Sequence, residues 1–486
     1  MTAPEGAVAR RRTSHPNVIV GTLLFAAFVF SIVQTFVAPA LPAVGAAYGS
    51  DPESTVWVLT AFLLASSIAT PLVGKLGDLY GRARVMTAIL VIFAIGSAVA
   101  GMSESLDLVL VGRVIQGVGG GVFPLSFGIL RETLEPRRVP GAIGLFSAMF
   151  GIGGALGLPL SGVVIEHLGV SYLFWIGVLA LPAAFFVRRY VPAAAATRPG
   201  RIDWAGAAAL SFALASLLLG LSMSNRWGWT SPGVLALIVG GVLGLAGWVL
   251  LEQRVRDPLI EFRVLRHRPV LMANISGVLV GFAMFSSFLL VPQFLQTPAS
   301  EGYGFGLTVT AAGLVILPAA LVQIALSPFA GVLARRVSTR FPLLVGASAL
   351  IASFTVLVVA HDRLIDFVIA SAILGVGLAL SMASMANVVV DAVPRNEVGV
   401  ATGINQVSRT VGGALGTQVV TTLVTAQLAA GSTYPAERGY TIAFVVGGVS
   451  GVLALAAALA IPRRRGGLSD VPVTSTAPER VAVRTG

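Results

Sequence analysis

The stretch "GKLGDLYGRAR" at residues 74–84 interrupts an otherwise apolar part of the chain. The twenty residues before it, 54–73, and the sixteen residues 86–101 carry no charged side chain. Lys75, Asp78, Arg82 and Arg84 lie in the stretch itself, among three glycines. An apolar run of about 20 residues is long enough to cross a bilayer as a helix. The pattern therefore predicts two membrane-spanning helices that are joined by a short, charged, glycine-rich turn.

The composition extends this prediction to the whole chain. Of the 486 residues, 56% are hydrophobic and 11% are charged, whereas soluble domains have about 25% charged residues. This chain is too apolar to cover itself with polar surface in water, which predicts a polytopic membrane protein. It has no cysteine, which excludes disulfides and thiolate metal sites. None of the four histidines has the spacing of a metal-binding pair, so we expect no metal site.

Fourteen apolar segments are long enough to span a membrane. They lie at about 18–38, 54–73, 85–103, 108–130, 139–165, 171–190, 203–221, 232–251, 270–295, 308–333, 341–360, 365–391, 397–428 and 440–461.

The basic residues alternate with these segments. If the N-terminus is cytoplasmic, the cytoplasmic segments hold 27 of the 32 Lys and Arg residues. The opposite loops hold Arg226, Arg363 and Arg438, and the predicted spans hold Arg113 and Arg409. This bias follows the positive-inside rule and predicts that both termini are cytoplasmic. The positive charge is then expected to face anionic lipid headgroups and not nucleic acid.

The chain also contains an internal repeat. The sequence "GGALG" occurs at 153–157 and again at 412–416, an offset of 259 residues that also relates Asp107 to Asp366. The stretch at 74–84 has a degraded counterpart, "GVLARRVSTR", at an offset near 257. These offsets relate spans 1–6 to spans 9–14 and leave spans 7 and 8 as an insertion. We therefore expect an all-α membrane protein with two pseudo-symmetric six-helix bundles, two inserted central helices and a cavity between the bundles.

The expected parts are a cytoplasmic tail (1–16), a first bundle (17–192), the inserted helices (193–256), a second bundle (257–462) and a disordered cytoplasmic tail (463–486).

At residues 74–84 the chain resembles the major facilitator superfamily, and within it the fourteen-spanner drug:proton antiporter family. The family pattern GxLxDRxGRxxx is matched by Gly74, Asp78, Gly81 and Arg82, whereas Leu79 stands where the family has an arginine. The resemblance covers almost the whole chain and implies a major facilitator fold. Near the lipid boundary Asp78 needs a partner, either Arg82 or a helix N-terminus across the bundle interface. We expect this contact to latch the bundles together in one conformation; a solvated turn is the alternative.

A second stretch, "GRVIQGVGGGVFP" at 112–124, resembles the family pattern RxxQGxG of span 4. The resemblance implies a role of Arg113 in proton transfer. Since arginine does not deprotonate, Arg113 would tune an acid or bind a carboxylate. The proton-coupling candidates are accordingly Arg113 with Asp107, Glu104 and Glu166. The alternative is an arginine that extends to the membrane interface.

A third stretch, "GIGGALGLPLSG" at 151–162, resembles the antiporter pattern GxxxGPxxGG of span 5. Gly153, Gly157 and Gly162 stand close to the required places, but Pro159 comes one residue late and Ser161 replaces a glycine. We expect close helix contact and a bend here. General packing through small residues is the alternative.

Span 1 departs from the family. Its stretch "IVQTFVAPALP" at 32–42 has Val33 where the pattern LDxTxxNxALP has an acid. By the placement above, all 21 acidic residues fall in loops or at the ends of spans. A lipophilic cation in hydrocarbon needs a buried counterion. We therefore expect neutral, zwitterionic or anionic amphipathic substrates.

Polar side chains inside the spans tend to face the bundle interior, where they line a cavity or hold helices together. The candidates for the substrate cavity are Gln34, Thr35, Gln116, Asn274, Gln293, Gln323, Asn387, Asn405, Gln406 and Arg409.

The resemblance implies a proton-coupled secondary active exporter of drugs, antibiotics or secondary metabolites that works by alternating access. A dedicated single-metabolite transporter, working as a uniporter or an importer, is the alternative. No phosphate-binding loop or nucleophile constellation indicates an enzyme. We expect a monomer in the bacterial cytoplasmic membrane that uses the proton gradient and no cofactor.

Overall fold

The computed structural model describes residues 15–50, 52–192, 203–255, 262–394, 397–426 and 434–463, and the regular elements in these ranges are helical. They are α1 (Pro16–Tyr48), α2 (Pro52–Thr55), α3 (Trp57–Tyr80), α4 (Arg82–Gly101), α5 (Leu106–Gln116), η1 (Gly117–Gly121), α6 (Val122–Thr133), α7 (Val139–His167), α8 (Ser171–Trp175), η2 (Ile176–Leu179), α9 (Ala180–Tyr190), α10 (Trp204–Trp227), α11 (Pro232–Glu252), α12 (Phe262–Arg266), α13 (Arg268–Gln296), η3 (Ala299–Glu301), α14 (Val309–Arg336), α15 (Phe341–Val359), α16 (Leu364–Ala392), α17 (Val398–Thr425) and α18 (Glu437–Leu459).

Each of the fourteen predicted spans contains a helix. Within the described residues, twelve helical segments are long and apolar enough to cross a membrane. The two remaining long helices are α7, part of whose side chains lies outside the described structure, and α17. Asn405, Gln406 and Arg409 make α17 more polar than its neighbours. The all-α fold is thus confirmed, while the count of fourteen spans stays a prediction.

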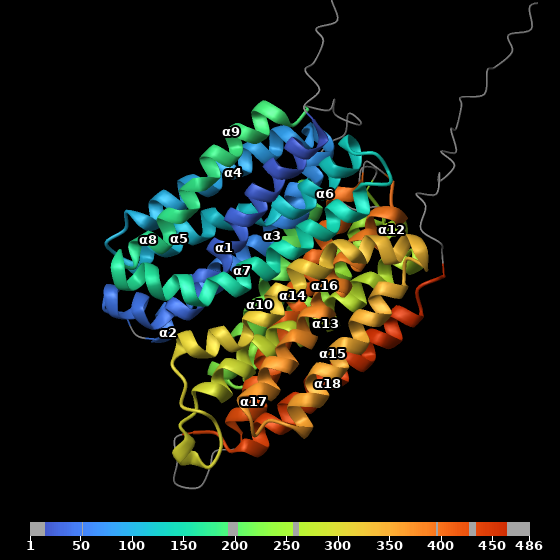
Figure 1. Cartoon of the computed structure of the whole chain (residues 1–486). Coiled ribbons are helices and arrows are strands. Elements are labelled where there is room, and N and C mark those ends of the chain that lie inside the picture. The colour runs from blue at the N-terminus through green and yellow to red at the C-terminus, as the bar shows by residue number, and fades with distance from the viewer. Residues whose placement is uncertain are drawn as a thin grey trace, which may run out of the picture.

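The helices form two bundles, one of α1–α9 and one of α13–α18 (Figure 1). Aromatic side chains fill the core of each. In the first bundle Phe30 packs against Phe62 and Phe93, with ring centroids 5.9 and 6.0 Å away. In the second, Phe294 lies 5.1 Å from Phe367 and 5.2 Å from Tyr440. Each bundle therefore has its own core, as expected of two repeated units.

The helices α10 and α11 pack against each other, and α10 also contacts α3 of the first bundle and α17 of the second. A close approach at Gly241 joins the pair, because a Cβ there would lie 2.7 Å from the backbone nitrogen of Leu217. The outer side of α11 exposes Leu235, Val239 and Leu243. Such a surface is typical of a helix that faces lipid. The predicted boundaries of this insertion, 193 and 256, lie outside the described residues.

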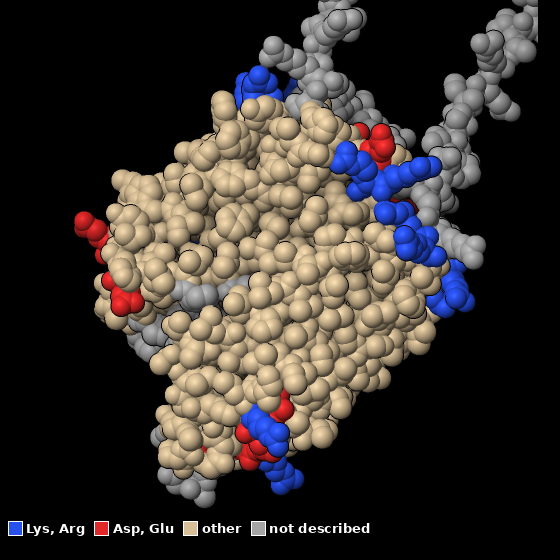
Figure 2. All heavy atoms as spheres, in the orientation of Figure 1, with Lys and Arg blue, Asp and Glu red and all other residues tan. Residues whose placement is uncertain are grey.

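Helix α1 begins and helix α18 ends on the same side of the molecule, at the upper right of Figure 1. We call this end the terminal face; Asn17 and Arg138, at the starts of α1 and α7, are hydrogen-bonded there. The opposite end is called the far face. Lys and Arg side chains gather at the terminal face (Figure 2), which matches the charge alternation in the sequence.

Candidate functional site

The turn between α3 and α4 holds a buried ion pair. Asp78 lies in the last turn of α3, and Arg82 begins α4. Gly81 joins them with φ of 95°, a conformation that side-chain-bearing residues rarely adopt. Nε and Nη2 of Arg82 donate to Oδ1 of Asp78 at 2.9 and 2.6 Å, and both residues are at most 6% exposed. Removing one partner of such a pair costs about 3–5 kcal/mol.

Arg82 also binds the neighbouring helix α6. Its Nη1 donates to the carboxylate of Glu132 and, at 3.3 Å, to the carbonyl oxygen of Gly128. One guanidinium therefore joins α3, α4 and α6 and fixes the carboxylate of Asp78 in place.

Asp78 continues the contact into the second bundle. It accepts a hydrogen bond from the backbone N–H of Val400, in the first turn of α17, where N–H groups have no partner inside the helix. Beside it, a Cβ on Gly74 would lie 2.7 Å from the carbonyl carbon and oxygen of Gly399. Both expected partners of Asp78, Arg82 and a helix N-terminus across the interface, are thus present.

A second close approach repeats the first through the internal symmetry. A Cβ on Gly331 would lie 2.7 Å from the carbonyl carbon of Pro140, where α14 meets α7. The offset of 257 residues relates Gly74 to Gly331, and the offset of 259 relates Pro140 to Gly399. In place of Asp78, however, this contact has Arg335, whose Nη1 donates to the carbonyl oxygen of Arg137 at 3.0 Å on the surface. The close backbone contact is thus present in both halves of the repeat, whereas the acidic residue Asp78 of one half is replaced by the basic Arg335 in the other.

A third cross-bundle contact was missed by the sequence reasoning. Nη1 of Arg131, on α6, donates at 2.7 Å to the carbonyl oxygen of Val393, which ends α16 in the second bundle. Arg131 also interacts electrostatically with Asp391 of the same helix. In the sequence Arg131 is one more basic residue beside a span, 262 residues from its partner. The internal repeat could have drawn attention to this contact, because the offset of 259 residues relates Glu132, the neighbour of Arg131, to Asp391.

These cross-bundle contacts lie at the ends of α3, α6, α7, α14, α16 and α17 that form the terminal face. Figure 2 shows an indentation between the two bundles on the opposite side. The structure therefore represents a form in which the bundles are held together at the terminal face and diverge toward the far face.

Arg113 is fully buried in the first bundle, so it does not extend to the membrane interface. Its Nε donates to the carbonyl oxygen of Val58 at 2.9 Å, and its Nη1 donates to Oε1 of Gln116 at 2.7 Å. Its guanidinium also lies over the ring of Phe62, 4.1 Å from the centroid. Gln116 in turn donates to Oγ of Ser97 at 2.8 Å. A cation–π contact and charge-assisted hydrogen bonds to neutral acceptors thus stabilise a charge inside the bundle.

The three acids proposed to act with Arg113 are not brought to it. Glu104, Asp107 and Glu166 are exposed near the far face, and Arg113 contacts none of them in the described part of the chain. Residues that start or end a span lie at the interface, while Arg113 lies about two turns inside its helix. The proton-coupling role of the three acids stays a prediction.

The small residues of α7 pack against α1. Oγ1 of Thr35 donates to the carbonyl oxygen of Gly153 at 2.7 Å, and a Cβ on Gly157 would lie 2.9 Å from the same hydroxyl oxygen. Among the described residues, no heavy atom of another helix lies within 4 Å of the Cβ position of Gly162, so Gly162 is not part of the close contact seen here. Pro159 lies within α7, and its side chain is outside the described structure.

Of the residues predicted to line a substrate cavity, some form hydrogen bonds that join helices. Gln323 donates to the carbonyl oxygen of Ser147 across the bundle interface at 3.3 Å, and Asn405 donates to Oδ1 of Asn274 at 3.1 Å. Together with Gln116 and Thr35, these side chains hold helices together. Of the others, Gln34 and Gln406 are half-buried, Gln293 is exposed, and Asn387 and Arg409 are buried. Arg409 donates to Oε1 of Gln406 in α17.

The chain is similar to known membrane transporters over most of its length. It is 30% identical over 429 residues to an uncharacterized MFS-type transporter of Mycobacterium tuberculosis, covering 86% of this chain and 61% of that protein. It is 30% identical to the tetracenomycin C resistance and export protein of Streptomyces glaucescens, covering 83% of this chain and 74% of that protein. The multidrug transporter protein MdtP of Bacillus subtilis is 26% identical, with the same coverage.

The fold agrees with a solved structure. The crystal structure of the human organic anion transporter MFSD10 matches with a TM-score of 0.64 and 18% identity, covering 91% of this chain and 99% of that one. The Major Facilitator Superfamily model matches residues 23–205 and 204–417. The chain therefore belongs to the major facilitator superfamily.

Proposed function

We propose that this protein exports amphipathic organic compounds from a bacterial cell in exchange for protons, by alternating access. The observation that carries the proposal is the buried contact between Asp78 and the first turn of α17, which joins two bundles that diverge at the far face. The similarity to a multidrug transporter and to an antibiotic resistance and export protein supports the direction and the class of substrate.

The terminal face is the cytoplasmic one in this proposal. Its excess of Lys and Arg side chains supports that orientation. The far face then opens to the outside, and the form described here is outward-open. The protein would work as a monomer surrounded by lipid, without a cofactor.

Opening of the terminal face requires the cross-bundle contacts to break. The glycine contacts at Gly74 and Gly331 must separate, Asp78 must leave the first turn of α17, and Arg131 must leave Val393. A hydrogen bond to a charged group contributes about 1.5–3 kcal/mol. Binding of substrate and proton must therefore favour the other form by several kcal/mol to switch the equilibrium.

Two features support the choice of substrate and coupling ion. Arg113 and Arg409 are buried cations inside the bundles, and the acids of the described spans lie at their ends. This arrangement favours neutral, zwitterionic or anionic compounds over simple quaternary cations. The proton-transfer role that the family resemblance implies for Arg113 is part of the proposal.

Transport by the purified chain in proteoliposomes tests the proposal. With a pH gradient imposed, a labelled amphipathic antibiotic should move against its own gradient, and a protonophore should stop it. Asp78→Asn should lose most of this transport while keeping the protein folded. Net movement that ignores the protonophore and only follows the substrate gradient would instead establish the uniporter alternative. Susceptibility profiling of a pump-deleted bacterial host, with and without the gene, identifies the compounds to use.

A further inference from the structure

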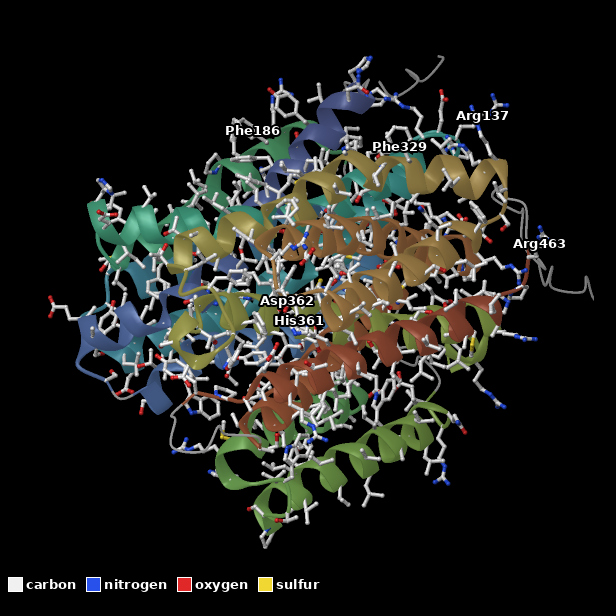
Figure 3. The ribbon with its side chains drawn as sticks, turned by 60° about the horizontal axis from the view of Figure 1, so that its bottom comes forward. Arg137, Phe186, Phe329, His361, Asp362 and Arg463 are labelled. Carbon is white, nitrogen blue, oxygen red and sulfur yellow. The ribbon has the colours of Figure 1, made fainter. Side chains whose placement is uncertain are left out.

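Three potential metal ligands meet at the far face of the second bundle. His361 and Asp362 lie in the loop between α15 and α16, and Glu437 is the first residue of α18. One ligand atom from each of the three side chains lies within 4.8 Å of the others. Figure 3 shows His361 and Asp362 next to each other, away from Arg137 and the terminal face.

The ring of His361 is already oriented by its surroundings. Its Nε2 lies 2.8 Å from Oε1 of Glu437, and its edge packs against the ring of Phe294 at 5.7 Å and 83°. The side chain of His361 is 14% exposed, and that of Glu437 is 45% exposed. Nδ1 of His361 makes no hydrogen bond within the described residues. In the metal-free form Nε2–H donates to Glu437; a bound metal ion would replace this proton and take the lone pair of Nε2, while the proton of the neutral ring lies on Nδ1.

The donor set is one that divalent transition metals use. Zinc is bound by imidazole nitrogen and carboxylate oxygen at about 2.0–2.2 Å, and three protein ligands with one water complete a tetrahedral site. At these bond lengths ligand atoms are separated by roughly 3.3–3.6 Å. Nε2 and Oε1 would have to move apart by less than about 1 Å, which a rotation of the half-exposed Glu437 provides. The two carboxylates balance the charge of the ion.

We propose that His361, Asp362 and Glu437 bind a divalent transition-metal ion, of which zinc fits the ligand set best. The ion would tie the loop between α15 and α16 to the start of α18. Since all three residues belong to the second bundle, the site does not depend on the transport cycle proposed above. This proposal departs from the expectation of no metal site, which considered only the spacing of the histidines, whereas 76 residues separate His361 from Glu437.

Zinc titration of the full-length chain in lipid nanodiscs tests the proposal. Isothermal titration calorimetry and thermal unfolding should show saturable binding of one zinc ion and a higher midpoint of unfolding. His361→Ala should weaken the binding at least tenfold, and Asp362→Asn and Glu437→Gln should each weaken it as well. The matched controls are His167→Ala and Glu135→Gln, which alter an exposed histidine and an exposed acid away from the site and should leave the affinity unchanged.

The proposal is overturned if zinc does not bind saturably to the unmodified chain, or if His361→Ala binds it as well as His167→Ala does. Cobalt provides a readout that does not depend on stability. Bound Co²⁺ should give the visible absorption of a tetrahedral nitrogen–oxygen site, and Glu437→Gln should change that spectrum. An unchanged spectrum would place the ion elsewhere, also against the proposal.

Discussion

The close approach of Gly74 to Gly399 makes Gly74→Ala a direct test of how the bundles are held together. The new Cβ would lie 2.7 Å from the carbonyl carbon and oxygen of Gly399, whereas ordinary contact begins at 3.4 Å. These neighbours are backbone atoms of a helix, so they cannot rotate away as a side chain would. The two helices must separate, and the strain applies only while the terminal face is closed.

The expected effect follows from the cost of overpacking. An extra methyl group in a tight interface costs about 1–3 kcal/mol when its neighbours cannot adjust. If the open form is free of this strain, the ratio of open to closed terminal face rises by about 5- to 150-fold. Such a shift is large enough to measure as a change of populations.

The chain has no cysteine, so pairs of spin labels can be placed without removing native residues. Glu135→Cys with Arg336→Cys reports on the terminal face, and Leu168→Cys with Leu364→Cys reports on the far face; all four positions are exposed. In Gly74→Ala, double electron–electron resonance should show longer distances at the terminal face and shorter ones at the far face.

Gly141→Ala is the matched control, because among the described residues no heavy atom from beyond its own turn of α7 lies within 4 Å of its Cβ position. It should leave both distance distributions as they are in the parent. If Gly74→Ala folds and gives the same distributions as Gly141→Ala, the strain argument fails, and the glycine contact does not set the position of the bundles.

Three further predictions concern single contacts. Arg131→Gln removes a charge-assisted bond to Val393, worth about 1.5–3 kcal/mol, and should also lengthen the terminal-face distances; unchanged distances would deny the contact a role in closure. Gln116→Leu leaves a hydrogen-bond donor of the buried Arg113 without its acceptor, a cost of about 1–3 kcal/mol that should lower the thermal unfolding midpoint by about 1–3 °C. Thr35→Val removes one helix–helix hydrogen bond, about 1 kcal/mol, so its midpoint should fall less than that of Gln116→Leu; an equal or larger fall would contradict this ranking.

The fold could be predicted because its signals are spread along the whole chain. The alternation of apolar segments and basic loops, together with the shared offset of the repeats, indicated helices that are all found. The contacts of Asp78 were predicted because its cost near lipid restricts its partners to a cation or a helix N-terminus. The need to cross the membrane as a helix, and the need to pair a charge near lipid, each allowed only a few structures.

The partners of individual site residues were harder to predict where they come from helices that are distant in the sequence. Arg131 and Val393 meet only because two bundles close on each other, and no local pattern marks them. Arg113 was expected to need an acid, but the ring of Phe62 and the amide of Gln116 provide its contacts. Periodicity assigns a residue to a helix, yet it does not say which neighbour that side chain meets.

The two symmetric contacts, between α3 and α17 and between α7 and α14, differ in charge, and this difference predicts the order in which they break. On one side a buried carboxylate touches a helix N-terminus; on the other, Arg335 binds a surface carbonyl oxygen that water can replace. When the terminal face opens, the bond of Arg335 should therefore break first, and the contact between Asp78 and the first turn of α17 should break last. In the proposed export cycle, the side of the interface formed by α7 and α14 would then be the first to admit a substrate molecule.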